Sequence, residues 1–274
     1  MRIYSAESIE SVVWRRARAS GVDLDTYCRA ALLLPYAKRI GNLEDTVVHL
    51  DGAALQLAVS ETELRRRHLP APLRHRTRPV GARMHIGRVW VCPECLSGND
   101  AHARFLWNTP LSAICVEHRR YLVGQCDGCG EALRYNVFNA GARFGHWMDL
   151  WPGCLACGTP AGFGRRVPPR LLEMAADWEM ALAAGISDDE IRIVGRIADG
   201  VDRFPGLRKH LAVLCGDDSA DVRAVGILCV WWAFRAGLFV SGENAAAFRA
   251  VIFRTNVDEQ AVVRAIGFVA GRHA

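Results

Sequence analysis

The sequence contains no apolar run long enough to cross a membrane. Its longest such run, residues 224–234, covers about half of the ~20 residues that a spanning helix needs. The chain also opens without the basic and then apolar segment that directs proteins to an oxidising compartment. We therefore expect a cytoplasmic protein with no membrane segment, whose cysteines are reduced rather than paired in disulfides.

Motifs for common enzymatic chemistry are missing as well. The sequence has no G-x-x-x-x-G-K-S/T loop for nucleotide phosphates and no carboxylate set spaced convincingly for two-metal phosphoryl transfer. It has no Ser, His and Asp set in a recognisable nucleophile motif. These absences favour a protein that is not an enzyme.

Acidic residues are absent from one stretch, residues 64–91, which contains eight arginines and three histidines. Prolines and glycines from residue 70 to residue 88 predict an extended linker there. A charge run is usually a solvated surface, but arginines on such a segment could also meet phosphates, which require only charge and reach. The net charge of +5 permits a nucleic-acid partner. The predicted nucleic-acid contacts are Arg65, Arg66, Arg67, Arg74, Arg76 and Arg78.

Seven cysteines and one histidine form four closely spaced pairs in the middle of the chain. The pairs are Cys92 with Cys95, Cys115 with His118, Cys126 with Cys129, and Cys154 with Cys157. In a reduced protein this spacing is typical of tetrahedral zinc sites, because each pair supplies two ligands from one side of the ion. We predict two structural zinc ions in closed shells, which leave no position for a catalytic water.

The spacing leaves two ways of pairing these ligands. In the sequential arrangement the first two pairs share one ion and the last two pairs share the other. In a crossed arrangement the first pair joins the third, and the second joins the fourth. His102 and His146 have no partner at this spacing and are left out of both shells.

Helical periodicity precedes the cysteine region. An amphipathic helix is predicted over residues 5–20, with Ser5 as its N-cap and Gly21 as its stop signal. Residues 60–63 read as a capping box that introduces a short basic helix. This outline is typical of a helix-turn-helix, although a three-helix packing unit with solvated arginines fits nearly as well.

Helix-forming sequence also follows the cysteine region, after Pro168 and Pro169. A stripe of Leu171, Ala175 and Trp178 predicts one helix, and a capping box at residues 187–190 introduces the next. Further helices are predicted over residues 206–215, 221–236, 243–252 and 258–270. Residues 222–254 fit a second helix-turn-helix, but the apolar Val230, Trp231 and Trp232 argue equally for a helical protein-docking or dimerisation unit.

Together these patterns predict a mainly α protein with small zinc-ribbon-like β elements. We expect a helix-turn-helix-like N-terminal segment with its basic linker over residues 1–88, a double zinc-binding module over 89–164, and an all-helical C-terminal domain over 165–274.

Several short segments form a combined motif. They are Glu7-Ser8-Ile9-Glu10-Ser11 at the start, Cys92-Pro93-Glu94-Cys95-Leu96, Phe105-Leu106-Trp107 as an aromatic strand, Cys115-Val116-Glu117-His118, and the CxxCG runs at Cys126 and Cys154. These segments resemble the TniQ family, the target-selection accessory proteins of Tn7-like and Tn5053-like transposons. The resemblance covers roughly residues 5–160. Val12 stands where the family often has Trp, and the C-terminal domain carries no motif that matches.

The resemblance implies a bacterial adaptor in DNA transposition. Such a protein binds target DNA or a guide-RNA recognition complex, as in CRISPR-associated transposons, and recruits the AAA+ ATPase that passes the site to the transposase. The apolar C-terminal helices make a homodimer reasonable. One alternative is a protein-only zinc scaffold. Another is a RING-like module, which has the same ligand order, but the seven residues between His118 and Cys126 are more than its crossed shells normally allow.

Overall fold

The computed structural model of the chain is mainly helical in the part that it describes. The residues described are 4, 7, 9–22, 26–27, 30, 60, 62, 90–97, 101–104, 107, 113–131, 157, 159, 162–184, 187–201, 203–204, 206–207, 209–210, 222–238, 242, 244–253 and 258–269. They contain six helices and one two-stranded antiparallel sheet. The expectation of a mainly α chain with small β elements is confirmed at this level, whereas the predicted basic helix and linker, residues 64–88, lie outside the described residues.

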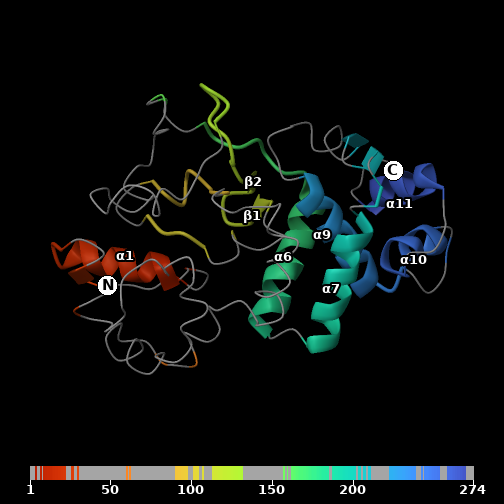
Figure 1. Cartoon of the computed structure of the whole chain (residues 1–274), viewed down its shortest axis with the longest axis horizontal. Helices are drawn as coiled ribbons and strands as arrows, with labels where there is room; N and C mark the ends of the chain where they lie inside the picture. The colour runs from red at the N-terminus through yellow and green to blue at the C-terminus, as the bar shows by residue number, and fades with distance from the viewer. Residues whose placement is uncertain are drawn as a thin grey trace.

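Five helices of the C-terminal region pack around one core. They are α6 (Pro169–Ala184), α7 (Asp188–Val201), α9 (Val222–Arg235), α10 (Ala245–Phe253) and α11 (Glu259–Val269). Helix α9 contacts α6, α7 and α11, and α10 packs against α7 and α11 (Figure 1). The helices predicted over 221–236, 243–252 and 258–270 are confirmed to within two residues at each end.

The apolar residues of α9 fill the centre of this bundle. Val230 and Trp231 are buried, and the Trp231 ring meets the ring of Trp178 from α6 edge to face, with centroids 5.0 Å apart. Trp232 is half-buried and its indole N–H donates to Asp177 over 2.8 Å. The apolar sequence that favoured a docking or dimerisation unit is therefore accounted for by packing within the chain. None of the described helices is long and apolar enough to span a membrane.

Local sequence determines how helices α6 and α7 begin. Helix α6 begins at Pro169, a residue suited to a first helical position because the amide hydrogen it lacks has no helical partner there. In the capping box, the Ser187 hydroxyl accepts from the Glu190 amide over 3.2 Å, as predicted. The Glu190 carboxylate instead accepts from Arg235 of α9 over 2.7 Å, because the packing of α7 on α9 brings that guanidinium within reach.

Helix α1 (Ile9–Ala19) lies apart from the bundle, beside the cysteine region (Figure 1). It begins later than the predicted start at Ser5, because Glu7 is held in extended conformation by an antiparallel bridge to Arg104. It ends at Ala19, two residues before the predicted stop signal Gly21, which has a φ of 69°. The amide of Val22 donates to the Ala17 carbonyl over 3.2 Å.

The sheet is a short hairpin between α1 and the bundle (Figure 1). Strand β1 (Ile114–Cys115) pairs with β2 (Arg120–Tyr121), with Ile114 opposite Tyr121. Residues 116–119 form the turn, in which Arg119 has a φ of 56°. A second stretch, the segment around Val91, pairs with Val123 just after β2. These pairings bring the first two cysteine-containing segments side by side.

Candidate metal centre

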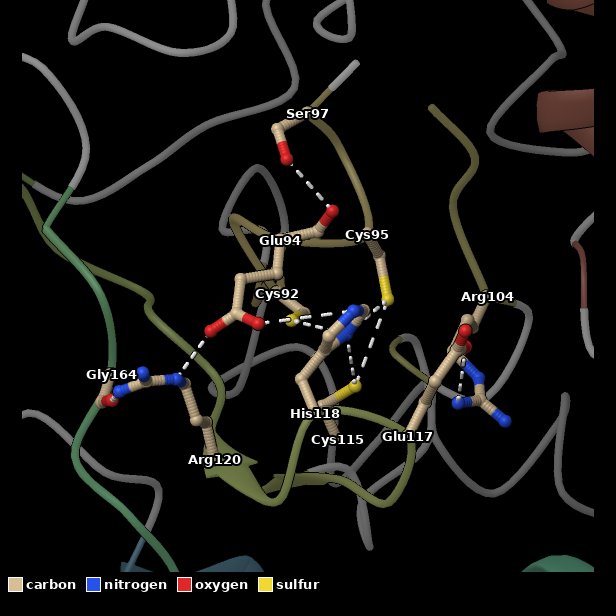
Figure 2. A network of polar contacts seen from close by, with 10 residues as sticks. All are labelled: Cys92, Glu94, Cys95, Ser97, Arg104, Cys115, Glu117, His118, Arg120 and Gly164. Atoms are coloured by element: carbon tan, nitrogen blue, oxygen red, sulfur yellow. Dashed lines mark hydrogen bonds and ion pairs between the residues drawn. The ribbon is translucent and has the colours of Figure 1, made fainter. Parts of the chain in front are cut away.

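The first cluster consists of four side chains from two segments that the hairpin holds together. Cys92 and Cys95 come from the turn after Val91, and Cys115 and His118 from strand β1 and the turn after it. Their ligand atoms all lie within 4.8 Å of one another. The three cysteines are buried, and His118 is half-buried with its ring toward the sulfurs (Figure 2).

The distances within this cluster fit a tetrahedral metal ion. The Nδ1 atom of His118 is 3.5 Å from the Cys92 sulfur, 3.3 Å from that of Cys95 and 3.5 Å from that of Cys115. The sulfurs of Cys95 and Cys115 are 3.7 Å apart. Zinc bonds of about 2.3 Å to sulfur and about 2.0 Å to nitrogen, at tetrahedral angles, separate sulfur from nitrogen by about 3.5 Å and two sulfurs by about 3.8 Å. The four side chains could therefore hold one metal ion without rearrangement.

Contacts among the three thiols shift their pKa values in opposite directions. Hydrogen bonding from Cys92 and Cys95 lowers the pKa of the Cys115 thiol far below its ordinary value. The contact with Cys115 raises the pKa of Cys92 to about 12, and burial adds to this. One thiolate is thus stabilised by two neighbours that stay protonated, and a bound cation is what would allow all three to ionise together.

A carboxylate stands behind the histidine. The Nε2 atom of His118, on the side of the ring away from the sulfurs, is 3.9 Å from a carboxylate oxygen of Glu94. Glu94 is also ion-paired with Arg120 of β2, whose Nη1 donates to the Gly164 carbonyl over 2.9 Å (Figure 2). A carboxylate in this position favours the ring orientation that aims Nδ1 at a metal. Sequence reasoning quoted Glu94 only as part of a motif and missed this role.

The second cluster is smaller in the described part of the chain and more exposed. Cys126, Cys129 and Cys157 come together, and the sulfurs of Cys126 and Cys157 are 3.5 Å apart. Cys129 and Cys157 are exposed. The Thr159 hydroxyl, 3.0 Å from the Cys157 sulfur, lowers the pKa of that thiol to about 6. The remaining predicted ligand, Cys154, lies outside the described residues.

These two groups correspond to the sequential arrangement. Cys92 and Cys95 meet the Cys115 and His118 pair, and the Cys126 pair meets Cys157. In a crossed arrangement the first pair would instead meet Cys126 and Cys129, so the RING-like ligand pairing is not the one adopted here. His102 comes close to Cys95 and Glu117, but its ring stacks on Tyr4, with centroids 4.2 Å apart.

The aromatic strand expected around Trp107 is not seen at that residue. Trp107 lies in a short helical turn, in which its amide donates to the Arg104 carbonyl over 3.2 Å. The side chain is buried in the same apolar cluster as Leu96, Cys95 and Cys115. Trp107 therefore belongs to the apolar packing around the first cluster.

Helix α1 is attached to this centre by buried polar groups. The Glu7 carboxylate, which is fully buried, accepts from the Ser11 hydroxyl over 2.8 Å and from Arg15 over 3.0 Å. The Ser11 hydroxyl oxygen in turn accepts from the amide of Ala103 over 3.0 Å. These hydrogen bonds hold α1 on the loop after Cys95. We call Glu7, Ser11 and Ala103 together the latch.

Arg104 joins the metal region to the helical bundle. Its guanidinium is paired with Glu179 of α6 over 2.8 Å and lies 3.6 Å from Glu117 in the hairpin turn. Burial raises the pKa of Glu179 to about 7, although Arg104 acts in the opposite direction. Sequence reasoning missed Arg104 and Glu179, and nothing in their local sequence marks them.

Fold and site together define a helical protein organised around clusters of cysteine and histidine that could hold metal ions. Residues 1–122 match the TniQ family model, so this part of the chain is a TniQ domain and the resemblance drawn from its motifs is confirmed there. TniQ is a family of transposition accessory proteins, which implies an accessory role in transposition. No curated protein matches the chain. The match includes the whole of the first cluster and ends before the second.

Proposed function

We propose that this chain is a zinc-stabilised adaptor in DNA transposition, which selects or marks the target site and recruits an AAA+ ATPase and, through it, the transposase. The observation that carries the proposal is the combination of the TniQ match over residues 1–122 with a four-ligand cluster inside it. The role in target selection comes from the family resemblance, and the structural role of the metal comes from the cluster.

Zinc is the metal that suits the first cluster best. Three thiolates and one imidazole at tetrahedral spacing form a common structural zinc site, whereas magnesium and calcium require oxygen ligands. All four positions are taken by protein side chains, Cys92, Cys95, Cys115 and His118. The ion would therefore stabilise the fold and would have no open position for a substrate.

A second zinc ion is proposed for Cys126, Cys129 and Cys157, with Cys154 as the fourth ligand. Three of these thiols already lie within 4.8 Å of one another. The amide of Gly128 donates to the Cys126 sulfur over 3.3 Å, an arrangement that stabilises a thiolate in a tight ligand-bearing turn.

The family resemblance and the arginines of residues 65–78 point to nucleic acid as a partner. We propose that Arg65, Arg66, Arg67, Arg74, Arg76 and Arg78 contact the phosphates of target DNA. A guide-RNA recognition complex could supply the target instead, in which case the same charges would face its nucleic acid.

Two measurements on the purified, reduced full chain test the proposal. Metal analysis should find two zinc ions per chain in the wild type and one in Cys115→Ser, with Cys229→Ala, a change at a buried cysteine outside the clusters, retaining both. Immobilised chain should capture the AAA+ ATPase of the same transposon together with duplex DNA. A folded protein without stoichiometric zinc, or capture that is unchanged after complete nuclease digestion, would contradict the zinc or the DNA part of the proposal, respectively.

A further inference from the structure

Two segments distant in sequence bring four arginines together beside the first cluster. Arg120 and Arg166 are partners in an antiparallel bridge. The amide of Tyr121 donates to the Arg165 carbonyl, and that of Val167 to the Arg119 carbonyl, each over 3.0 Å. The backbones of residues 119–120 and 165–166 therefore lie side by side. We name Arg119, Arg120, Arg165 and Arg166 the hairpin arginines.

A close backbone approach makes this pairing possible. At Gly164 a side-chain carbon would collide with the carbonyl oxygen of Tyr121, so only glycine allows the segment to lie so near β2. The Arg120 guanidinium donates to the Gly164 carbonyl over 2.9 Å, which ties the two segments a second time. The fold therefore determines the backbone positions of these arginines.

All four residues of these two paired segments are arginines. Arg119, Arg165 and Arg166 are exposed, and Arg120 is half-buried in its ion pair with Glu94. The sequence has no Asp or Glu between residues 150 and 172. Glu94 pairs with Arg120, and Arg120 stands directly opposite Arg166.

Like charges placed directly opposite each other on paired strands are destabilising. In antiparallel strands the opposed residues are only about 5 Å apart, so the cost is present whenever no anion lies nearby. A partner with closely spaced negative charges would remove that cost. The phosphate backbone of duplex DNA offers such a row, with one charge per about 1.7 Å of helix axis.

An aromatic side chain lies at the edge of the same surface. Phe163 is 65% exposed, and the Arg120 guanidinium lies over its ring at 5.5 Å from the centroid. An exposed aromatic ring next to arginines can cover the sugar face of a nucleic-acid strand while the guanidinium groups reach phosphates. Helix α6, which begins at Pro169 shortly after Arg166, carries no acidic residue in its first turn.

From this arrangement we infer that the hairpin arginines contact the phosphates of duplex DNA, in addition to the contacts proposed for Arg65, Arg66, Arg67, Arg74, Arg76 and Arg78. The inference rests on the proposed DNA-binding function and names a second surface for it. Because Arg119 and Arg120 directly follow the ligand His118, the metal centre would set the orientation of this surface toward DNA.

The test is the salt dependence of binding to a fluorescently labelled duplex, measured by anisotropy with the full chain between about 50 and 200 mM salt. For Arg119→Ala/Arg166→Ala we expect the slope of log Kobs against log salt to fall in magnitude by about 1.8, because each lost phosphate contact removes about 0.9. Arg119→Lys/Arg166→Lys should retain the wild-type slope, since phosphate contact needs charge. Arg249→Ala/Arg264→Ala, the same loss of charge on exposed positions of α10 and α11, should retain it as well.

The outcomes separate this inference from the broader proposal. If wild type binds DNA and the alanine variant, with normal zinc content, keeps the full slope, the hairpin arginines are not a DNA surface while the adaptor role stands. A lysine variant that loses as much as the alanine variant would assign these residues a structural role and overturn the inference. The same follows if the alanine variant loses the AAA+ ATPase and keeps DNA, which would make the surface a protein contact. A wild type that does not bind DNA overturns both proposals.

Discussion

Replacing Ser11 by alanine should destabilise the attachment of α1 to the metal region. The Ser11 hydroxyl is fully buried, donates to Glu7 and accepts from the Ala103 amide. A buried amide left without a partner costs about 1–3 kcal/mol, and losing a hydrogen bond to a charged group costs about 1.5–3 kcal/mol. Arg15 still donates to both carboxylate oxygens of Glu7, so part of the second loss is offset. We expect a total of about 2–4 kcal/mol.

Two readouts would establish this effect. Urea denaturation should show the lower free energy of unfolding, and hydrogen exchange should show that the Ala103 amide loses protection before the helical bundle does. Ser97→Ala is the matched control, because that hydroxyl donates to the Glu94 carbonyl from an exposed position, and a change within about 0.5 kcal/mol is expected. If Ser11→Ala is as stable as Ser97→Ala and Ala103 stays protected, the latch does not hold α1.

Three further predictions concern the bundle and the metal sites. Gly200→Ala should lower the free energy of unfolding by about 1–3 kcal/mol in a denaturation experiment. The new methyl group would collide with the Val251 carbonyl, where α7 packs against α10. An unchanged denaturation midpoint would contradict that packing. A chelator should remove metal in two phases, because Cys129 and Cys157 are exposed whereas Cys92, Cys95 and Cys115 are buried. The variant Cys129→Ser should lack the fast phase. A single phase in the wild type would contradict the faster release of metal from the second cluster. The pKa of Glu179 is raised from 4.5 to about 7, so the folded carboxyl keeps a proton that the unfolded one has released, and this group should make stability fall as pH rises through that window. Glu179→Gln should reduce that slope in denaturation measured from pH 4.5 to pH 7, and an identical pH profile would count against a raised pKa for this buried carboxyl.

The composition of the first cluster could be predicted from sequence because its signal is local. A spacing of two residues between ligands is enough to indicate that Cys92 and Cys95 face one ion, and the same holds for Cys115 and His118. The choice between sequential and crossed pairing depends on which segments lie side by side. That choice follows from the pairing of Val91 with Val123, and no sequence motif predicts this pairing.

The contacts that position the cluster could not be predicted for the same reason. Ser11 and Ala103 are 92 residues apart, and Arg104 and Glu179 are 75 residues apart. Periodicity reports which face of a helix is apolar, but it does not report what a buried carboxylate such as Glu7 will meet. The late start of α1 has this cause, because the bridge between Glu7 and Arg104 overrides a plausible N-cap at Ser5.

Helix periodicity was more informative for the bundle. The apolar residues of α9 favour a docking or dimerisation unit from sequence, whereas the structure places Val230 and Trp231 in the interior of the bundle. Sequence alone could not separate these two uses, since a partner helix from the same chain and one from another protein require the same residues.

The pairing of Tyr121 and Arg165 has a consequence for the order of events on the ribosome. All four ligands of the first cluster have been synthesised once His118 has appeared, but the segment that flanks their hairpin, residues 164–167, arrives only after the second cluster has also emerged. A nascent chain could capture its first ion early and would still lack one side of the hairpin until translation had passed that point. A fragment ending at residue 122, the limit of the family match, would stay in that unfinished state.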